Sequence, residues 1–151
     1  MISIPEDFLR RVEAAAEAAY PRECCGLFAG TRDDIGDIAV TRIRASANMA
    51  TNDPADRPDR FEIDPEIRFE LMRDIGEFDR RDDTAGEHIV GHYHSHPDGP
   101  ARPSAFDLEM AFEPDLFWLI IAVTDGRAAE TTLHRLDPAA QAFKEIAFRA
   151  V

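Results

Sequence analysis

A short stretch between Gly91 and Asp107 holds the residue types that bind metal ions. It reads G-H-Y-H-S-H-P-D-G-P-A-R-P-S-A-F-D, with three histidines at alternate positions and an aspartate at its end. Because a strand turns alternate side chains to the same face, we expect His92, His94 and His96 to lie together. Two imidazoles and one carboxylate would supply three ligands and leave a fourth position for water, which is typical of a catalytic zinc site.

Alternation alone does not decide which two histidines bind the metal. Ten residues separate His96 from Asp107, and a loop of that length can return a helix whose first turn directs Asp107 at two imidazoles. This spacing favours His94 and His96 as the ligands and leaves His92 as the alternative. The remaining two histidines are interpreted as structural or surface residues: His88 and His134.

Ser104 has two interpretations. The pattern S-x-x-D at a helix start is that of a capping serine followed by an acid at the third helical position. The same hydroxyl would lie one turn from Asp107, where it could donate to an oxyanion, and the two roles can coexist. A zinc hydrolase also needs a carboxylate as base, and composition does not choose one among the thirteen glutamates. Glu23 can reach the site only if the strand after it lies beside the histidine strand.

Composition and motif content exclude several classes of protein. H-E-x-x-H is absent, and so is H-x-E with P-C-x-x-C, which removes two other classes of zinc hydrolase. A net charge of −13 would repel phosphate backbones and anionic membranes, so we expect no nucleic-acid partner and no membrane association. With 151 residues, 44% of them hydrophobic, the chain is expected to form one domain over residues 1–151.

The location predicted from the sequence is cytoplasmic. The longest uncharged apolar run, residues 116–123, is too short to cross a bilayer, and the N-terminus does not resemble a signal peptide. The only cysteines, Cys24 and Cys25, are neighbours that cannot form a long-range disulfide, and we interpret them as small buried residues in a reducing compartment.

Periodicity predicts the elements that position the candidate ligands. A capping box formed by Ser3 and Glu6 should open an amphipathic helix that ends at Tyr20. A second helix should begin at Asp64, with Pro65 in its first position and four apolar residues on one face: Ile67, Leu71, Ile75 and Phe78. A third, short helix is expected over residues 104–112.

The remaining patterns predict strands and loops. A buried strand over 24–29 should pair with 38–43, a brief strand is expected over 61–63, and residues 117–123 should form a central strand. The histidine strand starts at Ile89, and a hairpin of 131–136 with 143–148 should follow. Residues 47–60 and 80–87 are expected to be a loop and a polar connection. The fold class is therefore α/β (mixed α+β), with a strongly bent mixed sheet packed between helices.

Four segments together resemble the JAB/JAMM family, the catalytic branch of the MPN domains. They are P-R-E-C-C-G-L-F-A-G, the loop with Asn48, R-F-E-I-D-P-E, and G-H-Y-H-S-H-P-(x)5-P-S-A-F-D. The resemblance covers roughly residues 1–136 and implies an MPN-type fold with cytidine-deaminase-like layering. The departures are His92, where relatives often carry a bulky apolar residue, and the doubled cysteine.

The resemblance also implies a function and roles for five residues. It implies a zinc-dependent metallopeptidase or isopeptidase whose Zn²⁺ is held by His94, His96 and Asp107. On the same resemblance Glu23 is the general acid/base, and Ser104 helps to stabilise the tetrahedral oxyanion. All five residues are present in the chain.

The short form of the chain resembles bacterial and archaeal members of the family. These are expected to act on ubiquitin-like sulfur-carrier proteins or other proteins with a Gly-Gly tail, and an extended Gly-Gly segment is thin enough to enter a narrow cleft along a sheet edge. Family members often form homodimers. Two alternatives are a metal-free MPN-type scaffold for protein–protein interaction and a RadC-like protein, which shares the His-x-His-Pro signature.

Overall fold

A computed structural model gives the fold of the protein and describes residues 1–52, 60–81 and 86–151. The strands are β1 (Ile2–Ile4), β2 (Cys25–Arg32), β3 (Ile38–Ser46), β4 (His88–Pro97), β5 (Phe117–Thr124), β6 (Arg127–Asp137), β7 (Ala142–Ile146) and β8 (Phe148–Ala150). The α-helices are α1 (Glu6–Ala19), α2 (Pro65–Asp74) and α3 (Ala105–Glu109), and two 3-10 helices are η1 (Met49–Asn52) and η2 (Glu77–Asp79).

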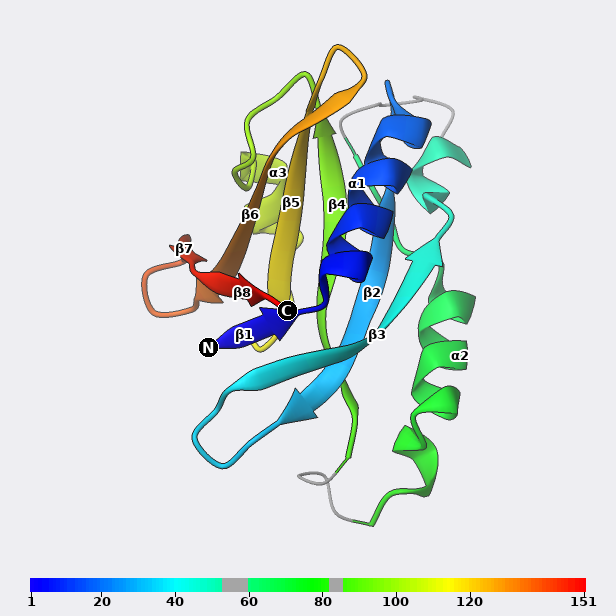
Figure 1. Cartoon of the computed structure of the whole chain (residues 1–151), viewed down its shortest axis with the longest axis vertical. Helices are drawn as coiled ribbons and strands as arrows, with labels where there is room; N and C mark the ends of the chain where they lie inside the picture. Colours follow the sequence, from blue (N-terminus) through cyan, green and yellow to red (C-terminus); the bar gives the residue numbers. More distant parts are fainter. Residues whose placement is uncertain (53–59, 82–85) are drawn as a thin grey trace.

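The strands form one mixed, strongly bent sheet, as the sequence predicts. Their order in space is β7-β6-β5-β4-β2-β3-β1-β8. β4 and β5 are parallel, and so are β1 and its two neighbours, whereas the other pairs are antiparallel. β7 and β8 lie at opposite ends of this order, yet only Ala147 separates them in sequence. The bend therefore brings the two edges of the sheet together (Figure 1).

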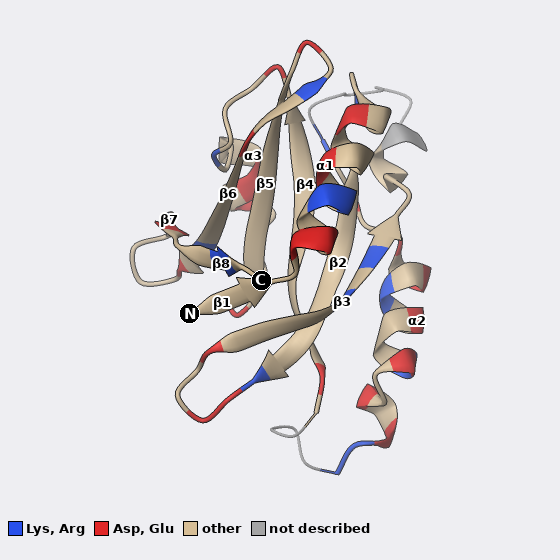
Figure 2. Ribbon diagram, viewed as in Figure 1, with Lys and Arg blue, Asp and Glu red and all other residues tan. Residues whose placement is uncertain are grey.

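The main hydrophobic core lies between α1 and one face of the sheet. Val12 and Ala16 of α1 are buried there because their spacing of four places both on the same side of the helix. They face large side chains from the central strands: Phe28, Tyr93, Phe117, Leu119, Ile121 and Leu133. β4 and β5 carry no Asp, Glu, Lys or Arg, and both strands are tan throughout Figure 2.

The predicted capping box at the start of α1 is wrong. Ser3 lies in β1, Pro5 is the N-cap, and no side chain caps the helix. Ile2 and Ile4 alternate around Ser3 and are almost completely buried. Burying two isoleucines stabilises the fold by about 3–6 kcal/mol, which exceeds the contribution of one capping hydrogen bond.

The opposite face of the sheet carries α2, α3 and the histidines. α2 begins as predicted, with the Asp64 carboxylate accepting a hydrogen bond from the Glu66 amide at 2.9 Å and Pro65 in the first position. Leu71 and Ile75 pack on Leu27 and other apolar residues of this face. In Figure 1 α1 lies in front of the sheet and α3 lies behind it, beyond β5 and β6.

Several other predicted boundaries differ from the structure. α2 ends at Asp74, and Gly76, at φ +72°, turns the chain, so Phe78 lies outside the helix, 53% exposed and packed on Phe69. In place of a strand over 61–63 there is a single bridge between Asn48 and Ile63. α3 ends three residues earlier than predicted. Residues 53–59 and 82–85 of the predicted loops lie outside the described residues.

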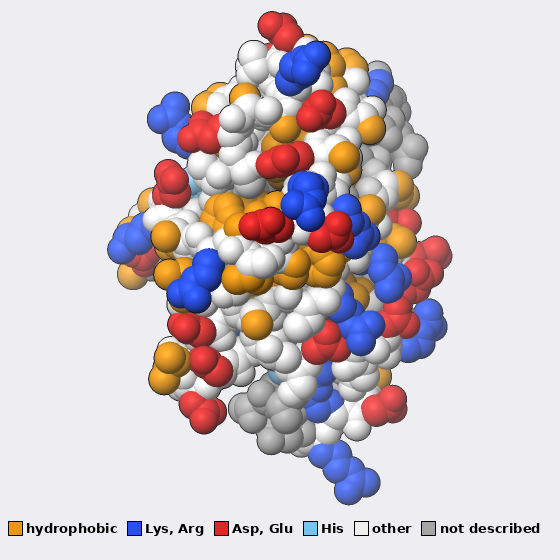
Figure 3. All heavy atoms as spheres, viewed as in Figure 1, with side chains coloured by type: hydrophobic (Ala, Val, Ile, Leu, Met, Phe, Trp, Pro, Cys, Tyr) orange, Lys and Arg blue, Asp and Glu red, His pale blue; other side chains and the backbone are white. Residues whose placement is uncertain are grey.

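Charged residues of both signs are interspersed over the α1 face in Figure 3. Among the described residues, no helix has both the length and the apolar character needed to cross a bilayer.

Candidate metal centre

β4 carries four histidines and holds three of them, His92, His94 and His96, on one face of the sheet, as alternation predicts. Their neighbours Tyr93 and Ser95 are also buried, because β4 is a central strand between β5 and β2. His94 is fully buried, and His92 and His96 are 8% and 9% exposed. The ring centroids of His94 and His96 are 4.9 Å apart, and those of His92 and His94 are 5.9 Å apart.

His94, His96 and Asp107 place three ligand atoms in a tight triangle. The two Nε2 atoms lie 3.0 Å apart, and Oδ2 of Asp107 lies 3.3 Å from Nε2 of His94 and 3.1 Å from Nε2 of His96. A tetrahedral zinc ion with bonds of about 2.0–2.1 Å requires ligand atoms roughly 3.3 Å apart. The triangle therefore fits such an ion. Among the described residues, it is the group of three His, Cys, Asp or Glu side chains whose ligand atoms lie close enough together to hold a metal.

Asp107 reaches the triangle because the first turn of α3 is capped. The Ser104 hydroxyl accepts a hydrogen bond from the Asp107 amide at 3.0 Å, and the Ser104 amide donates to Oδ2 of Asp107 at 2.8 Å. This reciprocal arrangement is the capping box predicted from S-x-x-D. The same bonds fix the rotamer that directs the carboxylate at the two imidazoles.

His96 is oriented by the loop after β4. Its Nδ1 donates to the Pro100 carbonyl at 2.8 Å, which leaves the Nε2 lone pair for a metal ion. The next residue, Ala101, is bound to β6, because the Ala101 carbonyl accepts a hydrogen bond from the Thr132 hydroxyl. Nε2 of His134, also in β6, lies 2.9 Å from the same hydroxyl. His134 is therefore structural, as predicted.

The electrostatics of the triangle favour a bound cation. Burial opposes ionisation of Asp107, but its hydrogen bonds to His94 and His96 outweigh burial and hold its pKa below the ordinary value. Burial lowers the pKa of His94, which keeps that imidazole neutral. Burial also opposes protonation of His96, yet its bonds to Asp107 and Pro100 raise its pKa. An ionised Asp107 and a neutral His94 are in the protonation state that a metal ion requires, and a cation that binds Nε2 of His96 displaces its proton.

Glu23 lies at the start of the strand beside β4. β2 pairs with β4 in antiparallel fashion, with Cys25 opposite His94, and the Cys24 amide donates to the Ser95 hydroxyl at 2.8 Å. The condition for Glu23 to reach the histidine strand is therefore met. Glu23 is 4% exposed and lines a cleft of about 630 Å³ that His96 and Ser104 also line.

Asn48 ties the Glu23 segment to the segment before α2. Its side-chain amide donates to the Glu23 carbonyl at 3.1 Å and to the Arg60 carbonyl at 2.9 Å, and its Oδ1 accepts from the Glu62 amide at 3.0 Å. These bonds place the Phe61 ring parallel to the His94 ring, with centroids 4.2 Å apart. In the sequence, Asn48 is marked only by the family resemblance, and no pattern indicates a role for Phe61.

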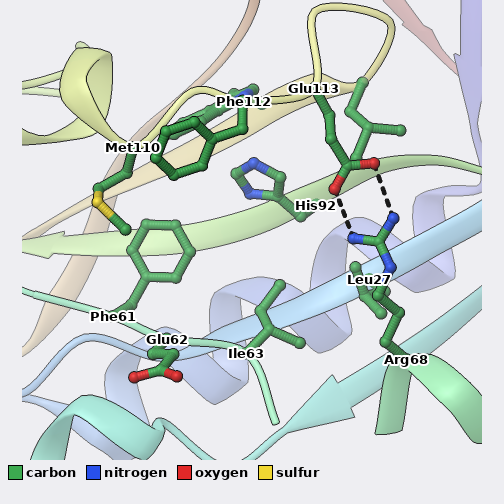
Figure 4. A pocket seen from close by; sticks show the side chains of 11 residues that line it. Leu27, Phe61, Glu62, Ile63, Arg68, His92, Met110, Phe112 and Glu113 are labelled. Carbon is green, nitrogen blue, oxygen red and sulfur yellow. Dashed lines mark hydrogen bonds and ion pairs between the residues drawn. The ribbon is translucent and has the colours of Figure 1, made fainter. Parts of the chain in front are cut away.

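A second cavity, of about 190 Å³, adjoins His92 (Figure 4). Its walls come from β2, β4, β5 and α2, from the segment before α2 and from the segment after α3. They include Leu27, Phe61, Phe112 and Trp118. Burial lowers the pKa of His92 to about 3. His92 does not belong to the ligand triangle, which agrees with the prediction from spacing.

Comparison with known proteins identifies the family. The family model of prokaryotic homologues of the JAB domain matches residues 5–137, so the chain belongs to that family. A JAB1/MPN domain protein from Archaeoglobus fulgidus shares the fold, with a TM-score of 0.54 at 16% identity over 99% of this chain and 94% of the other. A structure from Desulfitobacterium hafniense has a TM-score of 0.78 at 28% identity, over 100% of this chain and 93% of the other.

Two relatives have named activities. Desampylase of Haloferax volcanii is 32% identical over 122 residues, which is 81% of this chain and 77% of the relative. The CysO-cysteine peptidase of Mycobacterium tuberculosis (strain H37Rv) is 24% identical over 136 residues, 90% of this chain and 83% of the relative. The family resemblance predicted from the four sequence segments is thus confirmed.

Proposed function

We propose that the protein is a zinc-dependent peptidase or isopeptidase that cuts after the Gly-Gly tail of a ubiquitin-like carrier protein. The observation that carries the proposal is the ligand triangle of His94, His96 and Asp107 beside a cleft that contains Glu23 and Ser104. The activities named for the two relatives, a desampylase and a peptidase acting on CysO-cysteine, support the same class of substrate.

The proposed metal ligands fit zinc in number, spacing and chemistry. Two neutral imidazoles and one carboxylate leave one position open, as in catalytic zinc sites. A bound Zn²⁺ would polarise the scissile carbonyl and lower the pKa of water towards neutrality. His94, His96 and Asp107 would hold the ion, with the Pro100 carbonyl and the Ser104 amide keeping two of the three ligands in orientation.

The chain's own residues supply the proton transfers and part of the charge stabilisation. In the proposal Glu23 takes a proton from the attacking water and then gives it to the departing amine, so that the enzyme returns to its starting state. Ser104 donates a hydrogen bond to the carbonyl oxygen as negative charge develops on it. Both side chains line the cleft that His96 also lines, so a peptide bound there meets all three groups.

The experiment combines metal analysis with a cleavage assay. Protein purified without chelator is expected to contain about one zinc per chain, as one ligand triangle implies, and His94→Ala is expected to lose it. The zinc-loaded protein should cleave fusions in which a ubiquitin-like carrier ends in Gly-Gly before a reporter. Glu23→Gln serves as the matched control, because it is expected to keep zinc while losing cleavage.

Two outcomes would contradict the proposal. If the wild type leaves every Gly-Gly fusion intact and behaves like Glu23→Gln, the peptidase assignment fails. If the purified protein contains no zinc and takes none up, the metal-free scaffold becomes the better hypothesis.

The proposal extends to the organisation and location of the protein. We propose that residues 1–151 act as one domain, because all eight described strands belong to one sheet. We also propose that the protein is cytoplasmic, since both cysteines are free thiols. A homodimer remains a prediction from the family resemblance, and light scattering of the purified protein tests it.

A further inference from the structure

The cavity beside His92 has the size and lining of a binding site for one aromatic ring. Its volume of about 190 Å³ exceeds the roughly 150 Å³ at which an apolar cavity in a protein holds benzene. Four of its lining groups are rings, contributed by Phe61, His92, Phe112 and Trp118. Rings pack favourably against other rings in edge-on and offset arrangements.

His92 adds a polar group to the four rings, and the charged residues of the lining are Glu62, Arg68 and Glu113. The imidazole packs edge-on against Trp118, with centroids 4.2 Å apart, and Figure 4 shows it pointing between Phe112 and Phe61. His92 is 8% exposed, and its Nδ1 is buried without a hydrogen-bond partner in the described part of the chain. The imidazole lines the cavity, so a ligand that can hydrogen-bond to it should be preferred over one that cannot.

The cavity lies next to the ligand triangle, on the side away from the Glu23 cleft. Phe61 is the wall between them, with its ring 4.2 Å from that of His94 and 5.6 Å from that of His92. Along β4 the cavity residue His92 and the cleft residue His96 stand on opposite sides of His94. An extended substrate that crosses the triangle would therefore place a side chain in the cavity about two residues from the cut. Since the two residues before the cut are glycines in the proposed substrate, this side chain belongs to the segment after the cut.

Two large apolar side chains lie at the mouth of the cavity. Phe112 and Met110 line it and are 76% and 46% exposed, so their apolar surface is open to a ligand. Arg68 of α2 and Glu113 form a two-bond ion pair, with both distances 2.7 Å, that joins the walls on either side (Figure 4).

We propose that this cavity is a subsite for an aromatic side chain with a hydrogen-bonding group, such as that of tyrosine, on the protein substrate near the cleaved bond. The ring would occupy the apolar space, and its hydroxyl would form a hydrogen bond with His92. This inference rests on the proposed function for the claim that the aromatic side chain belongs to a protein substrate. Binding of an aromatic ring in the cavity, and its hydrogen bond to His92, can be tested without catalysis.

The test measures binding of p-cresol and toluene, the side-chain analogues of tyrosine and phenylalanine. Trp118 is the only tryptophan of the chain and lines the cavity, so its fluorescence, excited at the red edge of tryptophan absorption, reports binding. The wild type should bind p-cresol about threefold to tenfold more tightly than toluene, the range expected for one net hydrogen bond. His92→Phe should remove this preference.

Two further variants locate the site. Phe112→Ala removes one exposed wall without disturbing the core, and it should weaken binding of both analogues. Phe69 is an exposed aromatic residue of α2 that does not line the cavity. The matched control Phe69→Ala should therefore bind both analogues as tightly as the wild type does.

Equal affinities for the two analogues, or a p-cresol preference that survives in His92→Phe, would overturn the proposal. So would binding that Phe112→Ala leaves unchanged. Because no cleavage is measured, these outcomes are independent of the peptidase assay: a failed assay with intact p-cresol binding overturns the proposed function alone. In an active protein, tyrosine at the second residue after the cut should raise the cleavage rate over phenylalanine in the wild type, but not in His92→Phe.

Discussion

At the scale of single residues, Ser104 combines a folding role with a proposed catalytic one. Its hydroxyl caps α3 and its amide orients Asp107, while the residue also lines the cleft. Ser104→Ala is expected to lower kcat about 10²–10³-fold, the usual cost of one oxyanion donor. It should also reduce the free energy of unfolding by about 1 kcal/mol, because the cap is lost. Steady-state kinetics and urea unfolding measure the two effects.

Ser104→Gly separates these two roles. Glycine is tolerated at an N-cap at a cost of a few tenths of a kcal/mol, yet it has no hydroxyl to donate. The glycine variant should therefore be nearly as stable as the wild type and as inactive as Ser104→Ala. Activity retained in Ser104→Gly would mean that the serine acts only through the cap.

The ligand triangle was predictable from the sequence because its determinants are local. Alternation along one strand places His94 beside His96, and S-x-x-D marks the helix start that delivers Asp107. The supporting contacts were not predictable. Phe61 stacks on a histidine from another part of the chain, and Thr132 bonds to Ala101, 31 residues away. Such pairs depend on which strands become neighbours in the sheet, and the sequence of a single segment does not determine the neighbours of its strand.

At the scale of elements, the packing of β4 on β5 depends on Gly91. A Cβ atom at this position would lie 2.5 Å from ring carbons of Phe117, which is buried in the centre of the core. Gly91→Ala is therefore expected to lower the free energy of unfolding by roughly 1–3 kcal/mol, as overpacking usually does. Gly99→Ala is the matched control, since its Cβ would meet its nearest neighbour at 3.7 Å. Equal stability of the two variants would contradict the close packing.

The predicted elements failed where two local signals competed. Ser3 with Glu6 matches a capping box, but Ile2 and Ile4 also match a buried strand, and burial against the sheet decided the outcome. Likewise, Phe78 continues the apolar face of α2 by spacing alone, whereas Gly76 turns the chain before the helix can reach it. Local pattern predicted the three α-helices and the strands from β2 to β7, whereas β1, β8 and the two 3-10 helices were not predicted.

At the scale of the whole molecule, 30 acidic and 17 basic residues give a net charge of −13. The described ion pairs lie near the surface, among them those of Arg42 with Glu87 and Arg44 with Asp74. Pairs of this kind contribute little individually, so they do not cancel the repulsion among the excess carboxylates. That repulsion is larger in the compact state than in the unfolded chain, and it therefore lowers stability at low ionic strength.

The melting temperature should consequently rise as sodium chloride increases from about 10 to 150 mM, because the Debye length falls from about 30 to 8 Å over that range. Glu17→Gln combined with Glu130→Gln changes the net charge from −13 to −11 (−13 + 2) at two exposed positions. This variant should melt higher than the wild type at low salt and gain less from added salt. Calorimetry with the zinc content held fixed measures both effects, since bound metal would itself shift the melting temperature. A melting temperature that falls with salt would mean that the surface ion pairs, rather than the excess negative charge, dominate the electrostatic free energy.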